Sequence, residues 1–359
     1  MKGKVLVAMS GGVDSSVAAY LAKEAGWEPI GVTMKLFDGE IESTCCSLED
    51  TEDAADVARK LGIRHYVFNF KDRFRRDVID RFVAAYEAGM TPNPCIDCNR
   101  YLKFDELFRR ARELGCERVV TGHYARIEEE DGKRVLKKAL DPAKDQSYVL
   151  YSLTGGMLPF VEFPLGAMRK DEVRVLAEKL GFVNAKKHDS QDICFVPEGK
   201  YHEFIEEATG RKYPPGNFVD REGNVLGEHR GIIRYTIGQR RGLGLALPES
   251  LYVLGVDVEK NEVILGREEE LFSSTLTARD LTLSPGFLEN GTARVRARVR
   301  YRQPEKDATV ERTGQDEVKV VFDEPLRAIT LGQTVVFYDK DAVLGGGVII
   351  REKREVKNG

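Results

Sequence analysis

The sequence contains no long apolar run and carries almost no net charge. Its 359 residues include 55 Lys and Arg against 59 Asp and Glu, which gives a formal net charge of −4. A membrane-spanning helix needs roughly 20 consecutive apolar residues, and no stretch approaches that length. The charge balance provides no bulk attraction to nucleic acid. We therefore expect a soluble protein that contacts any nucleic acid through a segregated basic surface.

Cysteine is scarce, and the first residues do not form an export signal. The apolar run Val5–Met9 ends at glycines after about five residues, whereas an exported segment needs roughly 7–15. We therefore expect a cytoplasmic protein. Clustered cysteines in a reducing compartment more often serve metal binding or catalysis than a disulfide framework. The cysteines are Cys45, Cys46, Cys95, Cys98, Cys116 and Cys194.

The length of the chain predicts two or three domains. Up to about residue 200, short apolar runs alternate with amphipathic helical patterns, which predicts a parallel sheet covered on both faces. The expected strands are Lys4–Met9, Glu28–Met34, His65–Phe70 and Arg118–Thr121. The expected helices are Asp14–Gly26, Glu49–Leu61, Arg73–Ala88 and Lys103–Leu114. Ligands of such sheets bind at the carboxyl ends of the strands.

The pattern changes after residue 200. One more short helix is expected at Tyr201–Thr209, followed by hairpins at Asn217–Gly227 and Tyr252–Leu265. From about Leu276 onward the pattern is nearly all strand, with turns at Ser284-Pro285-Gly286 and similar clusters. This arrangement predicts a small β-rich central domain followed by a β-barrel.

The loop Ser10–Ser16 follows the first strand and opens the first helix. Its glycines allow phosphate oxygens to approach the backbone, and the helix N-terminus favours an anion. The lysine of the G-x-x-x-x-G-K-[ST] motif is missing, and so is G-x-G-x-x-G. We expect a pyrophosphate cradle in which Asp14 is a partner for Mg²⁺. The alternative is a plain strand-to-helix turn with an Asp or Ser cap.

Two further segments carry cysteines in polar loops. Thr91–Arg100 is a proline-braced loop with Cys95 and Cys98 in C-x-x-C spacing. Asp189–Phe195 contains Cys194 and follows Lys186, Lys187 and His188, whose charges would lower the thiol pKa. Ordinary thiols and a zinc site are the alternatives, although zinc would require a second close pair. Cys116 is expected in the core, and Cys45 and Cys46 in a mobile loop.

A strand near the C-terminus concentrates arginine. Period-two alternation sends five guanidiniums to one face and the apolar residues between them to the other. Their spacing of about 6.6 Å is close to a phosphate repeat, so this arginine stripe is a candidate RNA contact. A solvated barrel face is the alternative, and Arg240 and Arg241 would extend the patch. The stripe consists of Arg294, Arg296, Arg298, Arg300 and Arg302.

The loop is similar to that of N-type ATP pyrophosphatases, and a series of motifs resembles the MnmA family of tRNA-specific 2-thiouridylases in order and spacing. The resemblance covers essentially the whole chain. It implies a Rossmann-like, adenine nucleotide α-hydrolase-like domain over 1–203, a central β-rich linker domain over 204–273 and a tRNA-binding β-barrel over 274–359. The motifs are Ser10–Ser16, Thr91–Asn99, Thr121–Tyr124, Asp141–Tyr148, Asp189–Phe195, Thr236–Gly242 and Val343–Gly347.

The resemblance also implies roles for individual residues. Cys194 would carry a persulfide, and Cys98 would be the second catalytic cysteine, the nucleophile. ATP would be bound by Ala8, Met9, Ser10, Gly11, Gly12, Val13, Asp14, Ser15, Met34 and Gly122. The target base would face Asn93, Pro94 and Cys95, and tRNA would contact His123, Lys144, Asp145, Gln146, Arg300, Tyr301 and Gln333.

Cys95 departs from the pattern of some relatives, which carry Asp at this position. With Cys95, Cys98 and Cys194 together, the chain could instead hold an iron–sulfur cluster of the [4Fe-4S] type, since thiolates are the usual ligands. Such a cluster would bind sulfide directly and make the persulfide unnecessary.

The expected activity is ATP-dependent 2-thiolation of uridine 34 in tRNAs for Lys, Glu and Gln, through adenylation of O2. Expected partners are tRNA and a sulfur donor, either a cysteine desulfurase or a sulfur-relay protein, with ATP and Mg²⁺ as cofactors. One alternative is an amide or amidine ligase of the same ATP fold that uses nitrogen. Another is an RNA-binding or iron–sulfur module whose ATP site only regulates.

Overall fold

The computed structural model describes residues 2–37, 48–153, 156–189, 193–196, 200–245 and 249–352. The chain divides into two compact units. The first comprises Met1–Asp80, Pro94–Gly199 and Asp341–Val343, and the second comprises Arg81–Asn93, Lys200–Lys340 and Leu344–Gly359. Cys45, Cys46 and residues 190–192 of the Cys194 motif lie outside the described residues. Within the described part, no helix is long and apolar enough to cross a membrane.

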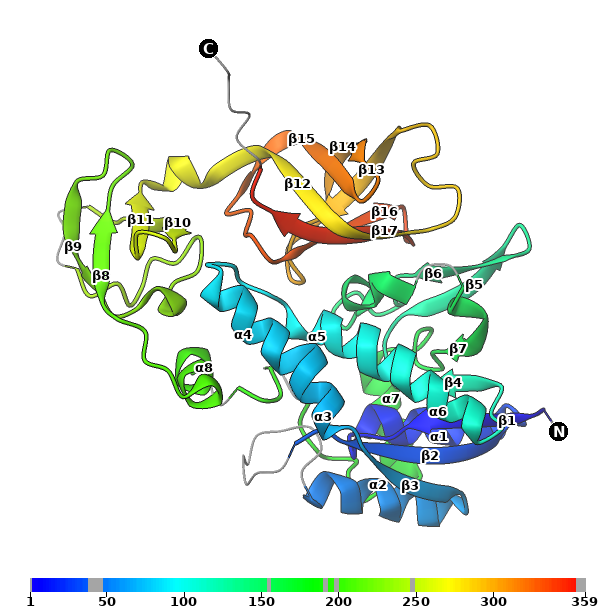
Figure 1. Ribbon diagram of the computed structural model, residues 1–359. Coiled ribbons are helices and arrows are strands. Elements are labelled where there is room, and N and C mark those ends of the chain that lie inside the picture. Colours follow the sequence, from blue (N-terminus) through cyan, green and yellow to red (C-terminus); the bar gives the residue numbers. More distant parts are fainter. Residues whose placement is uncertain are drawn as a thin grey trace. The chain divides into compact units, whose positions relative to one another are not determined.

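The first unit contains a five-stranded sheet in which all neighbouring strands are parallel (Figure 1). The order is β3-β2-β1-β4-β7, formed by Arg64–Asn69, Glu28–Lys35, Lys4–Ala8, Arg118–Val120 and Val161–Glu162. Every residue of β2 between its two ends is buried, as is typical of a parallel strand covered on both faces. The predicted parallel sheet is confirmed.

Three helices pack against β1 and against one another in a single hydrophobic core. These helices are α1 (Val13–Glu24), α2 (Leu48–Leu61) and α7 (Lys170–Lys179). Small side chains such as Ala18 and Ala58 are almost fully buried, which lets the helices approach closely. Helix α7 was not predicted from the sequence, and it positions the functional side chain of Lys170.

Two segments expected as single regular helices contain π-helical stretches. The segment predicted as Arg73–Ala88 consists of α3 (Lys71–Phe74), the π-helical η1 (Arg75–Ile79) and α4 (Asp80–Glu87). The second such segment begins earlier than predicted, at the C-x-x-C motif. It consists of α5 (Pro94–Asp97), the π-helical η2 (Cys98–Glu106) and α6 (Leu107–Glu113). A 3.6-residue pattern cannot reveal such wider turns, which are frequent at functional sites.

The remaining elements of the first unit are short. The antiparallel hairpin β5–β6 was not predicted, because its strands carry mostly charged side chains. The elements are β5 (Arg126–Glu130), β6 (Lys133–Lys137) and the 3₁₀ segments η3 (Ser147–Leu153) and η4 (Leu158–Phe160).

The second unit includes the segment Arg81–Asn93, which contains most of α4, and continues at Lys200. Its next element is α8 (Tyr201–Thr209), which has the predicted bounds. A four-stranded sheet of order β10-β11-β8-β9 follows, in which the two predicted hairpins are joined by a parallel pairing of β11 with β8. The strands are β8 (Gly216–Val219), β9 (Val225–His229), β10 (Tyr252–Asp257) and β11 (Glu262–Gly266), with 3₁₀ segments η6 (Ile232–Arg234) and η7 (Glu268–Leu271).

The rest of the second unit is an antiparallel barrel, as predicted (Figure 1). The strands follow the order β12-β15-β14-β13-β16-β17, and β12 pairs again with β17 to close the sheet. Val295, Ala297 and Val299 point into its core, which confirms the inward face of the alternating strand. The strands are β12 (Phe272–Leu283), β13 (Thr292–Arg298), β14 (Lys306–Gly314), β15 (Glu317–Arg327), β16 (Thr334–Asp339) and β17 (Ala342–Ile350).

His229 is a structural side chain of the central sheet and is 1% exposed. Its Nδ1 accepts a hydrogen bond from the N–H of Gly231 at 3.0 Å, and its Nε2 lies 3.1 Å from Asn261 O. This arrangement requires a neutral ring with its proton on Nε2. Burial accordingly lowers the pKa of His229 from 6.5.

This burial predicts a loss of stability in mild acid. Below pH 6.5 the unfolded chain binds a proton at His229 and the folded chain does not, so the free energy of unfolding falls as the pH falls. We expect His229→Gln to flatten the dependence of that free energy on pH between about 5 and 7, as measured by urea unfolding. His188→Gln, at an exposed side chain, should leave it unchanged. Equal slopes in the two variants would contradict the assignment.

Candidate functional site

The Gly-rich loop begins where β1 ends, beside β2. The N–H of Met9 donates to Val32 O at 2.8 Å, and Thr33 Oγ1 donates to Met9 O at 2.7 Å. Strand β4 lies on the other side of β1. Because the three strands are parallel, their carboxyl ends bring the loop together with Met34 and Gly122 at one edge of the sheet. These residues are the ones for which the resemblance implies ATP binding.

The first turn of α1 has no side-chain cap. Its N-cap is Gly12, whose extended backbone has φ −85° and ψ 162°. The hydroxyls of Ser15 and Ser16 donate to Gly12 O, each at 3.0 Å, and Ser15 Oγ accepts from the N–H of Ser10 at 3.1 Å. No side-chain cap hydrogen bond is formed at the N-cap. The alternative of a plain turn capped by Asp or Ser is therefore wrong. The positive end of the helix dipole and the N–H groups of the first turn, which have no capping side chain, suit the binding of a phosphate.

Two glycines allow neighbouring backbone to press against the loop. Gly11 has φ +76°, and a Cβ at this position would lie 2.2 Å from Asp50 O at the start of α2. A Cβ at Gly122 would lie 2.8 Å from Ser15 N. Any other residue at either position would force the loop to move, so the glycines fix the shape of the cradle.

Asn184 supports the loop through its side-chain amide, and no sequence motif indicates this role. Its Nδ2 donates to Gly11 O at 2.7 Å and lies 2.9 Å from Ser16 Oγ. The side chain is 3% exposed, and its Oδ1 has no hydrogen-bond partner in the described part of the chain. The buried amide therefore fixes the loop carbonyl and leaves the N–H groups on the opposite side of the peptide for a ligand.

Lys170, the first residue of α7, joins two carboxylates. Its Nζ lies 2.7 and 2.8 Å from the two carboxylate oxygens of Asp14, and 2.7 Å from Asp189 Oδ1. The Lys170 side chain is 10% exposed. Asp14 belongs to the Gly-rich loop, and Asp189 lies in the segment that leads to Cys194. One buried ammonium thus connects the loop with the cysteine segment.

Asp189 collects two further cations. Lys144 Nζ lies 2.7 Å from its Oδ2, and Arg174 donates to its Oδ1 at 2.9 Å. Burial alone would raise the pKa of Asp189, but the hydrogen bonds from Lys144 and Lys170 and their charges lower it to about 2. The carboxylate therefore stays ionised and fixes the position of its segment.

Tyr124 completes the surroundings of Asp14. Its hydroxyl donates to Asp14 Oδ1 at 2.8 Å. Burial, together with the adjacent Asp14 charge, raises the pKa of Tyr124, so the phenol remains a hydrogen-bond donor. Asp14 is thus held from two sides and keeps part of its carboxylate accessible, since the side chain is 31% exposed. This geometry is compatible with an additional Mg²⁺ partner.

Lys187 has carboxylate partners in the fold. Its Nζ lies 2.8 Å from Asp50 Oδ1 and 2.6 Å from Asp53 Oδ2, both on α2. Two carboxylates therefore balance the charge of Lys187, and its effect on the pKa of the Cys194 thiol stays a prediction. The sequence could not show this pairing, since the partners lie more than 130 residues away.

The C-x-x-C motif lies at the start of a helix. Pro94 is buried and Cys95 is exposed, so the turn is anchored by the proline and presents the cysteine. Cys98, partly buried, is the first residue of the π-helical η2. Asn99 is 2% exposed and donates through Nδ2 to Val149 O at 3.1 Å, which fixes the register of the helix beside Cys98.

The described residues do not form a metal site. No group of three or more His, Cys, Asp or Glu side chains in the described part of the chain is placed to hold a metal ion. An iron–sulfur cluster on Cys95, Cys98 and Cys194 stays a hypothesis from the sequence. Cys116 is buried, as expected, and its pKa is raised to about 11 by burial, so its thiol stays protonated.

Gln333 contacts the segment that precedes the C-x-x-C motif. Its Nε2 donates to Thr91 O at 2.7 Å, and the N–H of Thr91 donates to Leu331 O at 2.8 Å. The barrel turn thus holds the chain two residues before Asn93. Gln333 has a positioning role in the structure, and its contact with tRNA stays a prediction.

Three other residues expected at the tRNA are engaged within the first unit. His123 is 8% exposed, and its ring lies beside Phe104 and Phe163. Burial, followed by the charge of Lys103, lowers the pKa of His123, and the ring is therefore neutral. The other two form turns: Asp145 accepts hydrogen bonds from Ala139 and Ser147, and Gln146 Oε1 accepts from the N–H of Tyr124. Their contacts with tRNA stay predictions.

The arginine stripe is largely neutralised. Arg294 forms two hydrogen bonds of 2.7 Å with Asp323, and Arg298 donates to Glu305 at 2.9 Å. Strand β13 ends at Arg298, so Arg300 and Arg302 lie in the following turn and not on the strand. The interpretation of five guanidiniums on one open strand face is therefore wrong, because the strand ends at Arg298 and because Asp323 on β15 and Glu305, just before β14, pair with Arg294, Arg296 and Arg298.

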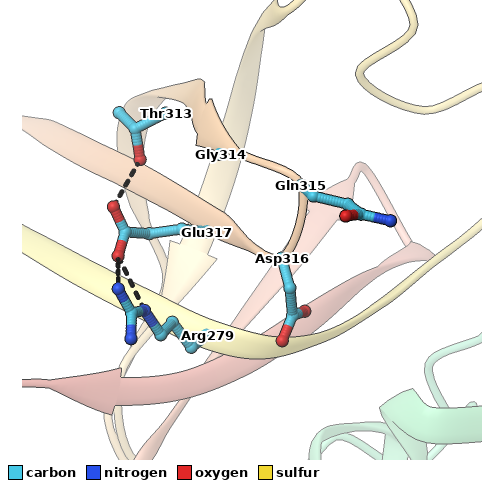
Figure 2. A pocket seen from close by; sticks show the side chains of 6 residues that line it. All are labelled: Arg279, Thr313, Gly314, Gln315, Asp316 and Glu317. Carbon is cyan, nitrogen blue, oxygen red and sulfur yellow. Dashed lines mark hydrogen bonds and ion pairs between the residues drawn. The ribbon is translucent and has the colours of Figure 1, made fainter.

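A shallow hollow of about 380 Å³ lies on the barrel (Figure 2). Its charged groups satisfy one another: Arg279 donates to Glu317 at 2.7 Å, and Thr313 Oγ1 donates to the same carboxylate at 3.0 Å. Asp316 accepts from the backbone N–H groups of residues 280 and 281. The hollow is therefore a feature of the strand turns and adds nothing to the site.

Family models match nearly the whole chain. They are described as a tRNA methyl transferase HUP domain (residues 3–198), a tRNA methyl transferase PRC-barrel domain (202–267) and an aminomethyltransferase beta-barrel domain (273–349). A tRNA-specific 2-thiouridylase MnmA of Clostridioides difficile is 47% identical over 97% of this chain and 98% of the relative. That of Carboxydothermus hydrogenoformans is 51% identical over 98% of both. The chain belongs to the MnmA family.

Other MnmA proteins and one more distant structure extend the comparison. The MnmA protein of Acetivibrio thermocellus is 49% identical over 97% of this chain and 99% of the relative. A chain of a solved 4-thiouridine synthetase–RNA complex with bound ATP is 21% identical. The match covers 58% of this chain and 50% of that chain, with a TM-score of 0.38.

Lys170 and Asn184 lie outside the MnmA motifs recognised from the sequence. Their partners in the loop are 156 and 173 residues away. No local pattern marks such residues, because only the packing of α7 and the following turn against α1 brings them to the loop. Lys170 and Asn184 thus anchor the uncapped loop from two elements that are distant in the sequence.

We expect Lys170→Met to destabilise the protein by about 3 kcal/mol, because it removes the cation that two partly buried carboxylates share and leaves Asp14 without an ion-pair partner. The measurement is urea unfolding at neutral pH. Lowering the pH to about 4 should reduce the difference from wild type, since one carboxylate can then take up a proton.

Lys179→Met is the matched control, because Lys179 is exposed on the same helix. We expect it to change the free energy of unfolding by no more than about 0.5 kcal/mol. Similar losses in the two variants would contradict the bridging role of Lys170.

Proposed function

We propose that the chain catalyses the ATP-dependent replacement of O2 of uridine 34 in tRNA by sulfur. The observation that carries the proposal is the uncapped Gly-rich loop whose Asp14 is joined through Lys170 to Asp189, in the segment of Cys194. This connection supports the proposal, because Asp189 lies five residues before Cys194 in the sequence. Membership of the MnmA family supports the same activity.

The loop is suited to bind the pyrophosphate part of ATP. Backbone N–H groups of residues 11–15 would contact the phosphate oxygens, and Met34 and Gly122 would flank the nucleotide at the same strand ends. A Walker lysine is missing from the loop, which suits release of pyrophosphate more than transfer of the γ-phosphate. Asp14 would hold Mg²⁺, which supplies neutralisation of phosphate charge.

In the first step, O2 of uridine 34 attacks the α-phosphate of ATP. The bond between the α- and β-phosphates breaks, and pyrophosphate leaves from the loop. The product is a tRNA whose C2 carries AMP as a leaving group. The target base must leave the anticodon stack to reach the site, which single-stranded loops allow at low cost. Asn93, Pro94 and the exposed Cys95 would face this base.

In the second step, the terminal sulfur of a persulfide on Cys194 attacks C2 and displaces AMP. The thiolate of Cys98 then attacks the Cys194 sulfur, which releases the 2-thiouridine and leaves a disulfide between Cys98 and Cys194. A dithiol reductant must reduce this disulfide before the next turnover. Persulfide on Cys194 must come from a sulfur donor, either a cysteine desulfurase or a sulfur-relay protein. We place this chemistry in the cytoplasm, where such reductants and tRNA occur together.

The contacts with tRNA are proposed for residues of both units. Lys144 and Tyr301 are partly exposed, so they can contact RNA directly. His123, Asp145, Gln146 and Gln333 would act mainly by holding the turns that line the site. Arg300 contacts Ile237 O and Ala328 O, each at 3.2 Å, and its contact with tRNA is likewise proposed.

We expect Cys98→Ser and Cys194→Ser each to lower the rate of 2-thiouridine formation by about 10³-fold or more, since each removes a reacting group. The assay uses unmodified tRNA, ATP and a sulfur donor, with the modified nucleoside quantified by mass spectrometry. Cys116→Ser is the control, because Cys116 is a buried thiol outside the site.

The same variants separate the alternatives. A ligase that uses nitrogen predicts full activity in both cysteine variants and no sulfur in the product. An RNA-binding module regulated by ATP predicts no AMP formation in the presence of tRNA. If wild-type protein with tRNA, ATP and sulfur donor forms neither AMP nor 2-thiouridine, the proposal is refuted.

A further inference from the structure

The turn that carries Cys194 is fixed by the two residues that follow the cysteine. Phe195 and Val196 are 3% and 4% exposed, whereas Cys194 is only partly buried. The N–H of Val196 donates to Ile193 O at 2.9 Å, which closes a four-residue turn. Two adjacent apolar side chains therefore anchor this turn in the protein interior, while the cysteine beside them stays accessible.

Phe195 packs against Phe74 of α3, and Phe74 packs against Phe37. The ring centroids of Phe195 and Phe74 lie 5.6 Å apart with an interplanar angle of 81°, which is an edge-to-face contact. The rings of Phe74 and Phe37 lie 5.9 Å apart. All three residues belong to the first unit. We call these three rings, Phe37, Phe74 and Phe195, the aromatic row.

The aromatic row begins at the carboxyl edge of the parallel sheet. The N–H of Phe70 donates to Lys35 O at 2.9 Å where β3 and β2 end, and the N–H of Phe74 donates to Phe70 O at 2.8 Å. Phe37 follows the last residue of β2 by two positions. The row therefore connects the strand ends at which the nucleotide is expected with the turn of Cys194.

The row differs in kind from the ionic anchor of the same segment. Three cations hold Asp189, which lies five residues before Cys194. Those ion pairs fix the start of the segment, and the cysteine itself is several residues away from them. Phe195 is the neighbour of Cys194 and is fully packed, so the row sets the position of the sulfur more directly.

Helix α3 also contacts the helical segment that begins at Cys98. Arg73 Nη1 lies 3.5 Å from Glu106 Oε2, and Arg73 Nη2 donates to Asp105 Oδ2 at 3.4 Å. Both carboxylates lie at the end of η2, whose first residue is Cys98. Adjacent residues of α3 thus contact the segments of both cysteines that the proposed sulfur chemistry uses.

Resting on the proposed function, we propose that Phe74 and Phe195 are positioning residues for sulfur transfer. The aromatic row holds Cys194 where its persulfide attacks C2 of the adenylated uridine, and it takes no part in adenylation. A phenylalanine ring carries no group that exchanges protons or electrons with a substrate, so the row acts through Cys194 alone. Misplacement of a reacting group by about 1 Å can cost roughly 10²-fold in rate.

The test separates adenylation from sulfur transfer in a single turnover. Full-length protein loaded with persulfide is mixed with unmodified tRNA and ATP, below the melting temperature of each variant, and pyrophosphate and 2-thiouridine are quantified in the same samples. We expect Phe195→Leu and Phe195→Met to slow 2-thiouridine formation by about 10- to 100-fold while pyrophosphate forms at the wild-type rate. Both variants keep an apolar side chain at this buried position, so either one serves if the other does not fold.

Phe160→Leu is the matched control. Phe160 and Phe108 form another aromatic pair of the first unit, with ring centroids 5.0 Å apart, and neither lies beside a reacting cysteine in the sequence. This variant should form pyrophosphate and 2-thiouridine at wild-type rates. Equal losses of both products in the Phe195 variants would indicate a general structural defect and overturn the positioning role. Wild-type rates for both products would overturn it as well.

A second measurement does not depend on thiolation. Alkylation of the reduced protein by iodoacetamide, without substrates, is followed at each cysteine by mass spectrometry. We expect Cys194 to react about 3-fold faster or more in the Phe195 variants, because the turn opens more often, while Cys98 reacts as in wild type. An unchanged rate at Cys194 would contradict the anchoring of its turn.

The two measurements distinguish this inference from the proposed function. If wild type forms no 2-thiouridine but Cys194 reacts faster in the Phe195 variants, the proposed function and the role in sulfur transfer both fail, and only the anchoring of the turn stands. If wild type thiolates tRNA and the Phe195 variants match it in both measurements, only the inference fails.

Discussion

The ion pairs of Lys170 are the interaction on which the candidate site depends. One ammonium, 10% exposed, contacts Asp14 in the Gly-rich loop and Asp189 in the segment of Cys194. Burying a charge is costly unless it is paired, so this arrangement holds only while both carboxylates and the lysine stay together. A movement of the loop that displaces Asp14 would therefore also disturb the contact between Lys170 and Asp189.

Much of the fold could be predicted from the sequence, because its signals are local. Apolar runs such as Pro29–Met34 mark doubly covered parallel strands, and the alternation in β13 marks a barrel strand. The loop was recognisable from its glycines and serines. The π-helical start at Cys98 was not, because the apolar period of a helix does not reveal a wider turn.

The parts of the site that could not be predicted depend on distant pairs. Lys170 and Asn184 reach the loop only through the packing of α7 and its following turn. The sequence around Arg294 shows no partner for its charge, whereas the fold brings Asp323 to 2.7 Å from it. The local sequence does not show whether a charged residue will have a partner in the fold.

The central claim is that O2 of uridine 34 is adenylated on the Gly-rich loop before sulfur enters. The most direct measurement uses tRNA with ¹⁸O at the C2 carbonyl of uridine 34, incubated with the protein, ATP and a sulfur donor. The account predicts that each 2-thiouridine formed is matched by one AMP that carries the ¹⁸O label in its phosphate. Formation of 2-thiouridine with unlabelled AMP, and with the label released to water, would contradict it.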